Sequence, residues 1–194
     1  MNNYSSNRNQ FRIIAGKWRS RKLPFPENIP SLRPTTDRIR ETVFNWLQLD
    51  LPGATCLDLF AGSGALSFEA CSRQAKSVTC IDSSPEAAVM IRDNCKLLQC
   101  DNMDVINSDA LRWLEQQKGQ CQFDIAFLDP PFSDNILNFC IEMLDSGNFL
   151  PAGGLVYIES GTPLDELVLP DTWTLKRNKK GGQVYFGVCE IKFI

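Results

Sequence analysis

Short apolar runs and helical segments alternate from residue 55 onward, and this rhythm constrains the fold more than any other feature. The apolar runs, which we expect to be strands, cover residues 55–60, 77–82, 103–108, 123–129 and 154–160. The segments between them, which we expect to be helices, cover residues 65–72, 83–98, 110–117 and 135–145. Short apolar strands that alternate with helices are typical of a parallel sheet covered on both faces. The rhythm therefore predicts a doubly wound α/β fold.

The two ends of the chain depart from this rhythm. Residues 173–194 read as two strands joined through Gly181 and Gly182, a hairpin that adds an antiparallel strand. Residues 11–23 read as two short strands around Gly16, and four prolines in residues 24–34 indicate a connector. We predict a mostly parallel seven-stranded sheet with an antiparallel C-terminal strand and a small N-terminal β-hairpin. The predicted division is an arm, residues 1–34, and a main domain, residues 35–194.

An amphipathic helix is predicted over residues 35–49, which Thr35 or Thr36 can cap. Its apolar residues fall on one face at helical spacing, which is typical of packing into a core. These residues are Ile39, Val43, Trp46 and Leu47. Packing is also the expected fate of Trp18 in the preceding hairpin.

The residue types exclude several kinds of chemistry. The chain has no histidine, which excludes mixed Cys/His zinc sites and Ser-His triads. Its eight cysteines are scattered without a C-x-x-C pair, so we expect free thiols and no metal. No run is long enough to span a membrane, and the polar, basic start is not a secretory signal. We expect a cytoplasmic monomer.

Charge is distributed unevenly along the chain. Residues 1–40 hold nine Lys/Arg against two Asp/Glu, whereas residues 41–194 hold eleven against twenty-one. A basic arm on an acidic body fits a polyanionic partner, although a solvated tail fits the charge equally well. The cations that we assign to RNA contact are Arg12, Lys17, Arg19, Arg21, Lys22, Arg33 and Arg38.

The carboxyl ends of the predicted strands are the expected ligand site, because ligands bind there in doubly wound sheets. The first strand is followed by a glycine-containing turn, and the second ends in an acid that suits ribose hydroxyls. The candidate cofactor-binding residues at the first three strand ends are Asp58, Ala61, Gly62, Ser63, Gly64, Asp82, Ser108, Asp109 and Ala110.

A nicotinamide site is the main rival for this edge. Its fingerprint needs a third small residue three positions after the second glycine, and Ser67 stands there. Asp58, four residues before Gly62, suits a cofactor with an amino group and a sulfonium better than a pyrophosphate. A simple strand-to-helix turn is the other interpretation of the same residues.

The fourth strand ends in Asp129, Pro130, Pro131 and Phe132. Proline cannot donate to a strand ladder, so the strand must stop there. A plain loop would account for the two prolines, but four specified residues at a predicted functional edge favour a catalytic motif.

Asp-Pro-Pro-Phe, together with the "AGSG" turn, resembles the amino-methyltransferases, which use S-adenosylmethionine to methylate exocyclic nitrogens. Six stretches, two of which contain these motifs, make the resemblance more specific, and the resemblance extends over nearly the whole chain from about residue 11. They are "RIIAGKWRSRKLPFP", "LRPTTDRIRETVFNWL", "LDLFAGSGALSFEA", "FLDPPF", "VYIES" and "GGQVYF". Together they resemble the RsmD-type bacterial methyltransferases.

The resemblance implies methyl transfer from S-adenosylmethionine, with S-adenosylhomocysteine as product, to N2 of one guanine in the helix 31 loop of 16S ribosomal RNA. We expect Asp129 and the Pro130 carbonyl to accept the amine N–H groups, Pro131 to stiffen the turn, and Phe132 to stack on the base. The expected partner is 16S ribosomal RNA within the small subunit or an assembly intermediate.

Two positions depart from the family pattern. The second strand often ends in Glu, where this chain has the shorter Asp82. Relatives often have Arg-Gly-Ala after the first helix, where this chain has Arg73, Gln74 and Ala75. A non-glycine residue then occupies the end of that helix.

Three other functions remain open from the residues alone. An adenine-N6 DNA methyltransferase would use the same four-residue motif, although no extra target-recognition domain is apparent. A non-catalytic ribosome-assembly factor could keep the fold, and a nicotinamide dehydrogenase is the most distant alternative. N6-methyladenosine as the product would favour the first of these.

Overall fold

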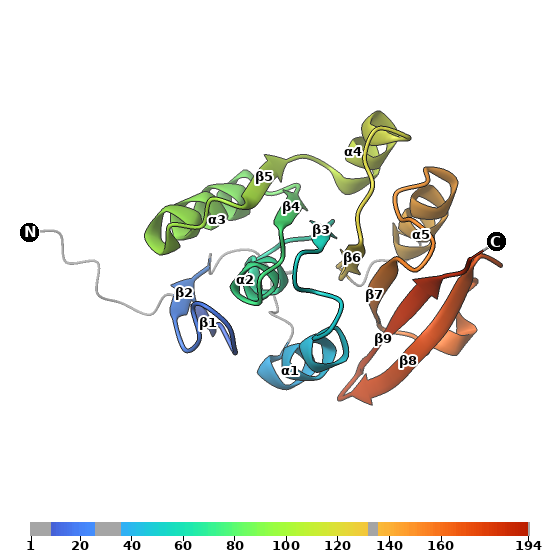
Figure 1. Ribbon diagram of the computed structural model, residues 1–194, viewed down its shortest axis with the longest axis horizontal. Helices are drawn as coiled ribbons and strands as arrows, with labels where there is room; N and C mark the ends of the chain where they lie inside the picture. Colours follow the sequence, from blue (N-terminus) through green and yellow to red (C-terminus); the bar gives the residue numbers. More distant parts are fainter. Residues whose placement is uncertain (1–8, 26–35, 132–135, 194) are drawn as a thin grey trace, which may run out of the picture.

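A seven-stranded sheet organises the chain in the computed structural model, which describes residues 9–25, 36–131 and 136–193 (Figure 1). Its strand order is β5-β4-β3-β6-β7-β9-β8. The strands are β3 (Thr55–Asp58), β4 (Ser77–Asp82), β5 (Met103–Asn107), β6 (Ile125–Leu128), β7 (Leu155–Ser160), β8 (Trp173–Gly181) and β9 (Val184–Ile191). The first five are parallel, and β9 runs antiparallel to both β7 and β8. The predicted fold class is confirmed.

Five helices and one short 3-10 turn accompany the sheet in the described ranges. They are α1 (Asp37–Trp46), α2 (Ala65–Ser72), α3 (Pro85–Leu98), α4 (Ala110–Gln117), α5 (Ile136–Ser146) and η1 (Leu164–Glu166). Helix α3 begins as the sequence predicts, with Pro85 in its first turn and the Ser84 hydroxyl accepting from the Ala87 N–H. None of the helices that the structure describes is long and apolar enough to cross a membrane.

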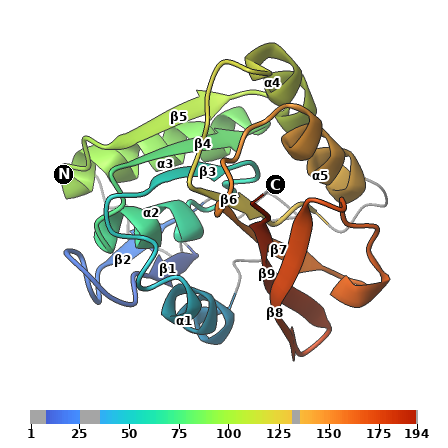
Figure 2. The same cartoon turned by 45° about the vertical axis from the view of Figure 1, so that its right-hand side comes forward.

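Helices pack on the sheet (Figure 2), and the buried apolar side chains form two separate cores, to which alternate residues of the strands contribute. One core joins α1, α2 and α3 to the sheet through residues such as Phe44, Phe68 and Phe127. The other core joins α4 and α5 to the sheet through residues such as Trp113 and Leu144. Strands β4 and β5 lie on one side of β3 in the sheet, and β6 and β7 lie on its other side. The direction in which successive strands are added therefore reverses between β3 and β6.

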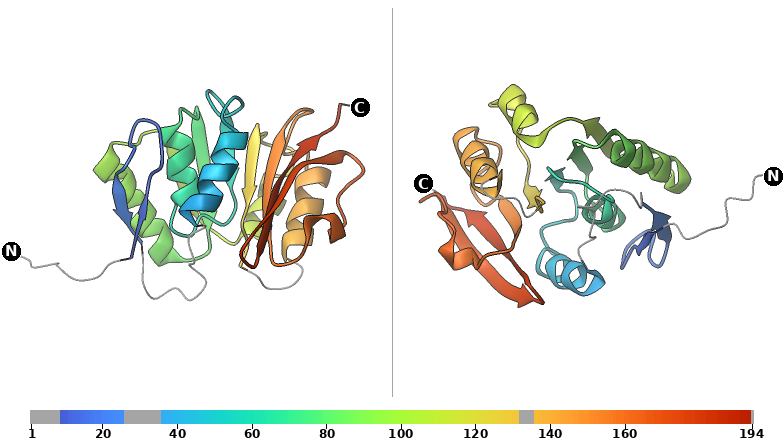
Figure 3. Two further views of the ribbon diagram at one scale, coloured as in Figure 1. Left: turned by 90° about the horizontal axis from the view of Figure 1, so that it is seen from below. Right: turned by 180° about the vertical axis from the view of Figure 1, so that it is seen from behind.

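Helix α1 packs against the sheet through the first of these cores, beside the β8–β9 hairpin (Figure 3). Ile39, Val43 and Leu47 are buried as the amphipathic pattern predicts, and Trp46 stacks on Phe186 at 5.6 Å between ring centroids. Thr36 caps the helix, because its hydroxyl accepts from the Ile39 N–H at 3.4 Å.

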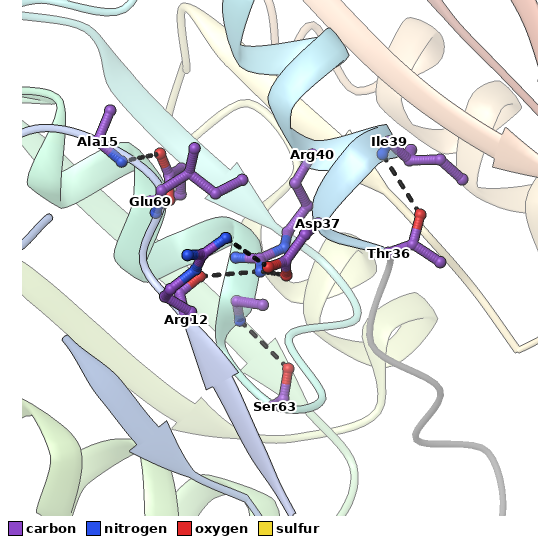
Figure 4. A network of polar contacts seen from close by, with 10 residues as sticks. Arg12, Ala15, Thr36, Asp37, Ile39, Arg40, Ser63 and Glu69 are labelled. Carbon is purple, nitrogen blue, oxygen red and sulfur yellow. Dashed lines mark hydrogen bonds and ion pairs between the residues drawn. The ribbon is translucent and has the colours of Figure 1, made fainter. Parts of the chain in front are cut away.

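The N-terminal segment forms a two-stranded hairpin, β1 (Gln10–Arg12) and β2 (Lys22–Pro24), that is fixed onto α2. The buried Glu69 carboxylate accepts from the N–H groups of Ile14, at 2.7 Å, and Ala15, at 3.0 Å (Figure 4). At the hairpin turn the Ser72 hydroxyl donates to the Ala15 carbonyl and accepts from the Trp18 N–H. The hairpin is therefore held by polar contacts buried under it as well as by apolar packing.

Arg40 ties the same hairpin to α1. Its fully buried guanidinium donates to the Arg12 carbonyl at 2.9 Å and pairs with Asp37 at 2.5 Å. Phe11, Ile13, Trp18 and other hairpin residues share one core with α1 and α2. Packing is thus confirmed as the fate of Trp18, while the division at residue 34 stays a prediction.

Candidate functional site

The carboxyl ends of the five parallel strands meet at one edge of the sheet, and the loops that follow them carry the predicted cofactor and catalytic residues (Figure 2). The loop after β3 carries Ala61 to Gly64, β4 ends in Asp82, and Ser108 follows β5. Asp129 and the two prolines follow β6, next to β3 in the sheet. The structure thus places these residues along one edge.

The turn between β3 and α2 is tight and depends on glycine. Gly62 and Gly64 have φ angles of 53° and 79°, in the left-handed region that other residues rarely adopt. The Gly64 N–H donates to the Ala61 carbonyl at 2.7 Å, and the Ala61 N–H donates to the Ile81 carbonyl on β4 at 2.9 Å. These bonds join the glycine turn to the end of the neighbouring strand.

Asp82 holds two loops together at this edge. One carboxylate oxygen accepts from the Gly62 N–H at 2.7 Å, and the other accepts from the Ser84 N–H at 2.8 Å. The side chain is half-buried, so part of it still faces solvent. The Asp82 carbonyl accepts from the Ser108 N–H at 3.0 Å, which joins the second strand end to the third.

Asp58 is a buried acid directly behind the glycine turn. One of its oxygens accepts from the Ser67 hydroxyl at 2.6 Å, while Oδ1 has no hydrogen-bond partner among the described residues. Burial raises the pKa of Asp58 from 3.8 to about 6, against the opposing effect of the Ser67 hydrogen bond. An acid that is costly to ionise and lacks a partner on one oxygen suits a cationic ligand group.

The residues after the third parallel strand, β5, mainly stabilise the start of α4. Asp109 is the N-cap of α4, where its carboxylate accepts from the Arg112 N–H at 2.9 Å. Ala110 is buried, and the Ser108 hydroxyl donates to the Asp109 carbonyl. Asp109 is exposed and can contact a ligand only in addition to this capping role.

Asp129 lies beside an acid that the sequence reasoning missed, Glu159. Phe127 pairs with Tyr157 in register and both pack into the core under α1, so Asp129 and Glu159, each two residues later, continue the same face. Glu159 is buried and accepts from the Tyr157 hydroxyl at 2.7 Å. Burial raises the pKa of Tyr157 well above 10, and the charges of Glu159 and Asp129 add to this. The sequence signal for Glu159 is its place in "VYIES", at the end of a strand.

Pro130 is buried and Pro131 is exposed immediately after this acid. Phe132 and Arg33 lie outside the described residues. Three acids at the carboxyl ends of the neighbouring strands β3, β6 and β7 lie on one face of the sheet: Asp58, Asp129 and Glu159. No group of three or more metal-binding side chains occurs in residues 9–25, 36–131 and 136–193.

The cations of the hairpin separate into two groups. Arg12 and Lys22 line an open cleft with Gln10, Phe11 and Asp37. The turn with Lys17 and Arg19 instead lies against Ser72, at the C-terminal end of α2 and therefore far from the strand ends. Arg12, Lys17, Arg19, Arg21, Lys22 and Arg38 are all exposed.

Comparisons with known proteins give one consistent result. The family model described as conserved hypothetical protein 95 matches residues 11–190. Ribosomal RNA small subunit methyltransferase D of Haemophilus influenzae is 44% identical over 180 residues, covering 91% of this chain and 92% of that protein. The Escherichia coli protein of the same name is 44% identical over 177 residues, covering 91% and 88%. The solved structure of a methyltransferase candidate from Escherichia coli has a TM-score of 0.86 at 42% identity, covering 96% of this chain and all of that one.

Proposed function

Because the chain belongs to the family described as conserved hypothetical protein 95, together with the ribosomal RNA small subunit methyltransferase D proteins, we propose that it methylates ribosomal RNA of the small subunit. The observation that carries the proposal is the placement of Asp129, Pro130 and Pro131 at a strand end adjacent to the glycine turn. This motif and this turn occupy the two sides of the point where the strand connections reverse.

S-adenosylmethionine is the cofactor that we propose for the glycine turn. It supplies a methyl group on a positively charged sulfur. Asp58 fits such a ligand, because its Oδ1 is buried with no hydrogen-bond partner in the described ranges and burial makes its charge costly. Gly62 and Gly64 allow the backbone to approach a ligand closely, and Asp82 offers acceptors for ribose hydroxyls. Ala61, Ser63, Ser108, Asp109 and Ala110 complete the proposed cofactor set.

The catalytic roles follow from the chemistry of an aromatic amine. Its lone pair is delocalised into the ring, so it needs alignment rather than a strong base. The Asp129 carboxylate and the Pro130 carbonyl would accept its two N–H groups and turn the lone pair out of the ring plane. Positioning of this kind can supply much of a rate enhancement. Pro131 would stiffen the turn, and Phe132 would stack on the base.

The proposed target is N2 of one guanine in the helix 31 loop of 16S ribosomal RNA, in the subunit or in an assembly intermediate. The RsmD-type resemblance supports this choice, and the names of the relatives support the small subunit. The hairpin would bind RNA phosphates, with Arg12 and Lys22 nearer the site than Lys17 and Arg19. Arg21, Arg33 and Arg38 belong to the same proposed surface, and we propose that the enzyme acts as a monomer.

Product identity tests the proposal. Labelled methyl transfer should be measured from S-adenosylmethionine to protein-free 16S RNA, to assembled small subunits and to DNA, followed by nucleoside mass spectrometry. We expect N2-methylguanosine from a single RNA site. N6-methyladenosine, or label in DNA alone, would contradict it.

A further inference from the structure

Strand β8 carries a dense row of cations that is separate from the cations of the N-terminal β1–β2 hairpin. Residues 176–180 read Lys-Arg-Asn-Lys-Lys, and all five side chains are exposed. The strand lies at the edge of the sheet, next to β9 only. Lys176 pairs with Glu190 at 2.8 Å, whereas Arg177, Lys179 and Lys180 have no carboxylate within 4.0 Å in the described part of the chain. Three uncompensated cations thus lie along one strand of an acidic protein.

A β-bulge determines which face these cations occupy. Leu175 pairs with Cys189 and Arg177 pairs with Val188, so Lys176 is the extra residue of the bulge. Residues directly opposite in an antiparallel pair share a face. Arg177 therefore shares the face of Val188, and Lys179 shares that of Phe186. Val188 and Phe186 belong to the core beneath α1, so the bulge places Arg177 and Lys179 on the face that Asp58, Asp129 and Glu159 share.

The same strand pairing places these cations level with the proposed catalytic end of the sheet. Leu128, Ile158, Gly187 and Asn178 form one row across β6, β7, β9 and β8. Asp129 follows the first of these residues and Lys179 follows the last, and both strands run in the same direction. Three strand-to-strand steps correspond to about 14 Å. Lys179 is thus within a few nucleotides' reach of a base held at Asp129.

Helix α1 lies between the cations of β8 and the N-terminal β1–β2 hairpin and contacts both elements. A Cβ at Gly181 would lie 3.2 Å from the Ile39 side chain, so the tip of β8 packs on the first turn of α1. The exposed Arg38 precedes Ile39, and Asp37 contacts Arg12 of the hairpin at 3.4 Å. Exposed cations therefore border α1 on both sides.

We propose that Arg177 and Lys179 form a second RNA-binding surface, which holds phosphates on the side of the site opposite the hairpin. The inference rests on the proposed RNA methyltransferase function. Phosphate contacts fix the position of a nucleic acid without reading its sequence. Two separate cationic surfaces would hold the strand on both sides of the target base. Lys180 faces the other way and already donates to the Tyr185 hydroxyl at 2.8 Å, so its contribution is smaller.

Protection of the sheet edge is the simpler explanation of lysines on an edge strand. Charge of either sign protects an edge, but only positive charge binds phosphate. Reversal to Glu therefore keeps the protective role and removes the RNA-binding role. The test variant is Arg177→Glu/Lys179→Glu. The matched control is Lys76→Glu/Lys118→Glu, which makes the same change of charge at two exposed residues, one directly before β4 and one at the C-terminal end of α4.

Filter binding of a 16S ribosomal RNA transcript should be measured for each protein at several KCl concentrations. We expect the test variant to bind at least about tenfold more weakly than the control. The plot of log affinity against log salt concentration should be less steep for the test variant, by about 1.4 in slope, because two phosphate contacts are lost and each single-strand contact contributes about 0.7. In methyl transfer, KM for RNA should rise with kcat at saturating RNA unchanged, and affinity for S-adenosylmethionine should stay the same.

Equal RNA binding and equal salt slopes for the test and control variants, with a wild-type protein that binds and methylates RNA, would overturn this inference alone. A wild-type protein that neither binds nor methylates RNA would overturn the proposed function and this inference with it. A loss of S-adenosylmethionine affinity in the test variant, matching its loss of RNA affinity, would show a folding defect and would also count against the assignment.

Discussion

The Ser67 hydroxyl donates a 2.6 Å hydrogen bond to the buried Asp58 carboxylate, and it is the only side-chain donor to this acid in the described residues. Burial of the carboxylate raises the pKa of Asp58 from 3.8 to about 6, because hydrogen bonding from the Ser67 hydroxyl and from the backbone of Phe60 and Ser67 offsets only part of the cost of burial. The energetic cost of this burial has consequences for stability and for ligand binding.

The free energy of unfolding should fall as pH rises from about 4 to about 6. In that window the unfolded chain releases the Asp58 proton while the folded protein retains it, so deprotonation favours unfolding. The rise in the pKa of Asp58 from 3.8 to about 6 corresponds to about 3 kcal/mol. Relative to wild type, Asp58→Asn should gain up to about that much stability between pH 4 and pH 7, measured by urea unfolding. A difference that is independent of pH would contradict this.

Affinity for S-adenosylmethionine should depend on the same ionisation. The ionised Asp58 attracts a cationic ligand, and only about a tenth of it is ionised one pH unit below its pKa. Calorimetric titration of the wild-type protein should therefore show affinity about tenfold weaker at pH 5 than at pH 7. The Asp58→Asn variant, which cannot ionise, should bind weakly at both values. A wild-type affinity that does not change over this range would contradict the role of Asp58.

Glu69 should contribute strongly to stability through the hairpin. Its removal leaves the Ile14 and Ala15 N–H groups without their acceptor and Arg73 without its 2.7 Å partner. Each buried donor left unsatisfied costs about 1–3 kcal/mol. We expect Glu69→Ala to lower the free energy of unfolding by about 2–4 kcal/mol, and the exposed Glu115→Ala to change it by less than about 0.5 kcal/mol. Similar values for the two variants would show that the hairpin is not held by Glu69.

Gly16 offers a second test of the docked hairpin. Its φ is +81°, and a Cβ there would lie 1.9 Å from the Ser72 carbonyl oxygen. Gly119 has a similar φ of +70°, but a Cβ there would meet no neighbouring atom of the described residues within 4 Å. Gly119→Ala should therefore cost about 1–2 kcal/mol, for backbone strain alone, and Gly16→Ala clearly more. Equal losses in denaturant unfolding would mean that the turn does not pack on α2 as described.

Most of the helices, strands and turns that the sequence predicts are specified by residues close together in the chain. Proline at the start of α3, the glycine turn after β3 and the apolar alternation each depend on neighbouring residues. Gln74 illustrates a local prediction that is confirmed: a non-glycine residue, with φ of 75°, stands directly after the C-cap of α2. The cations of the hairpin are likewise exposed, as their place in a basic arm predicts.

Contacts between distant segments could not be predicted in the same way. Glu69 lies in an apolar helix, and its role depends on a hairpin 55 residues earlier in the chain. Glu159 gains its place beside Asp129 only from the register of β6 and β7. The bulge that turns Arg177 toward the site has no simple sequence signature, because it depends on pairing with β9. Such relationships require the tertiary structure.

The most direct test of the account is the turnover of Asp129→Ala, measured as labelled methyl transfer to 16S ribosomal RNA at saturating RNA. Asp104→Ala, at an exposed acid on β5, is the matched control. Removal of one acceptor or donor from a catalytic site typically costs about 100-fold or more in kcat. We predict a loss of at least that size for Asp129→Ala, with affinity for S-adenosylmethionine within about twofold of wild type, and a control that keeps its activity. An Asp129→Ala enzyme with wild-type kcat would contradict the proposed catalytic role.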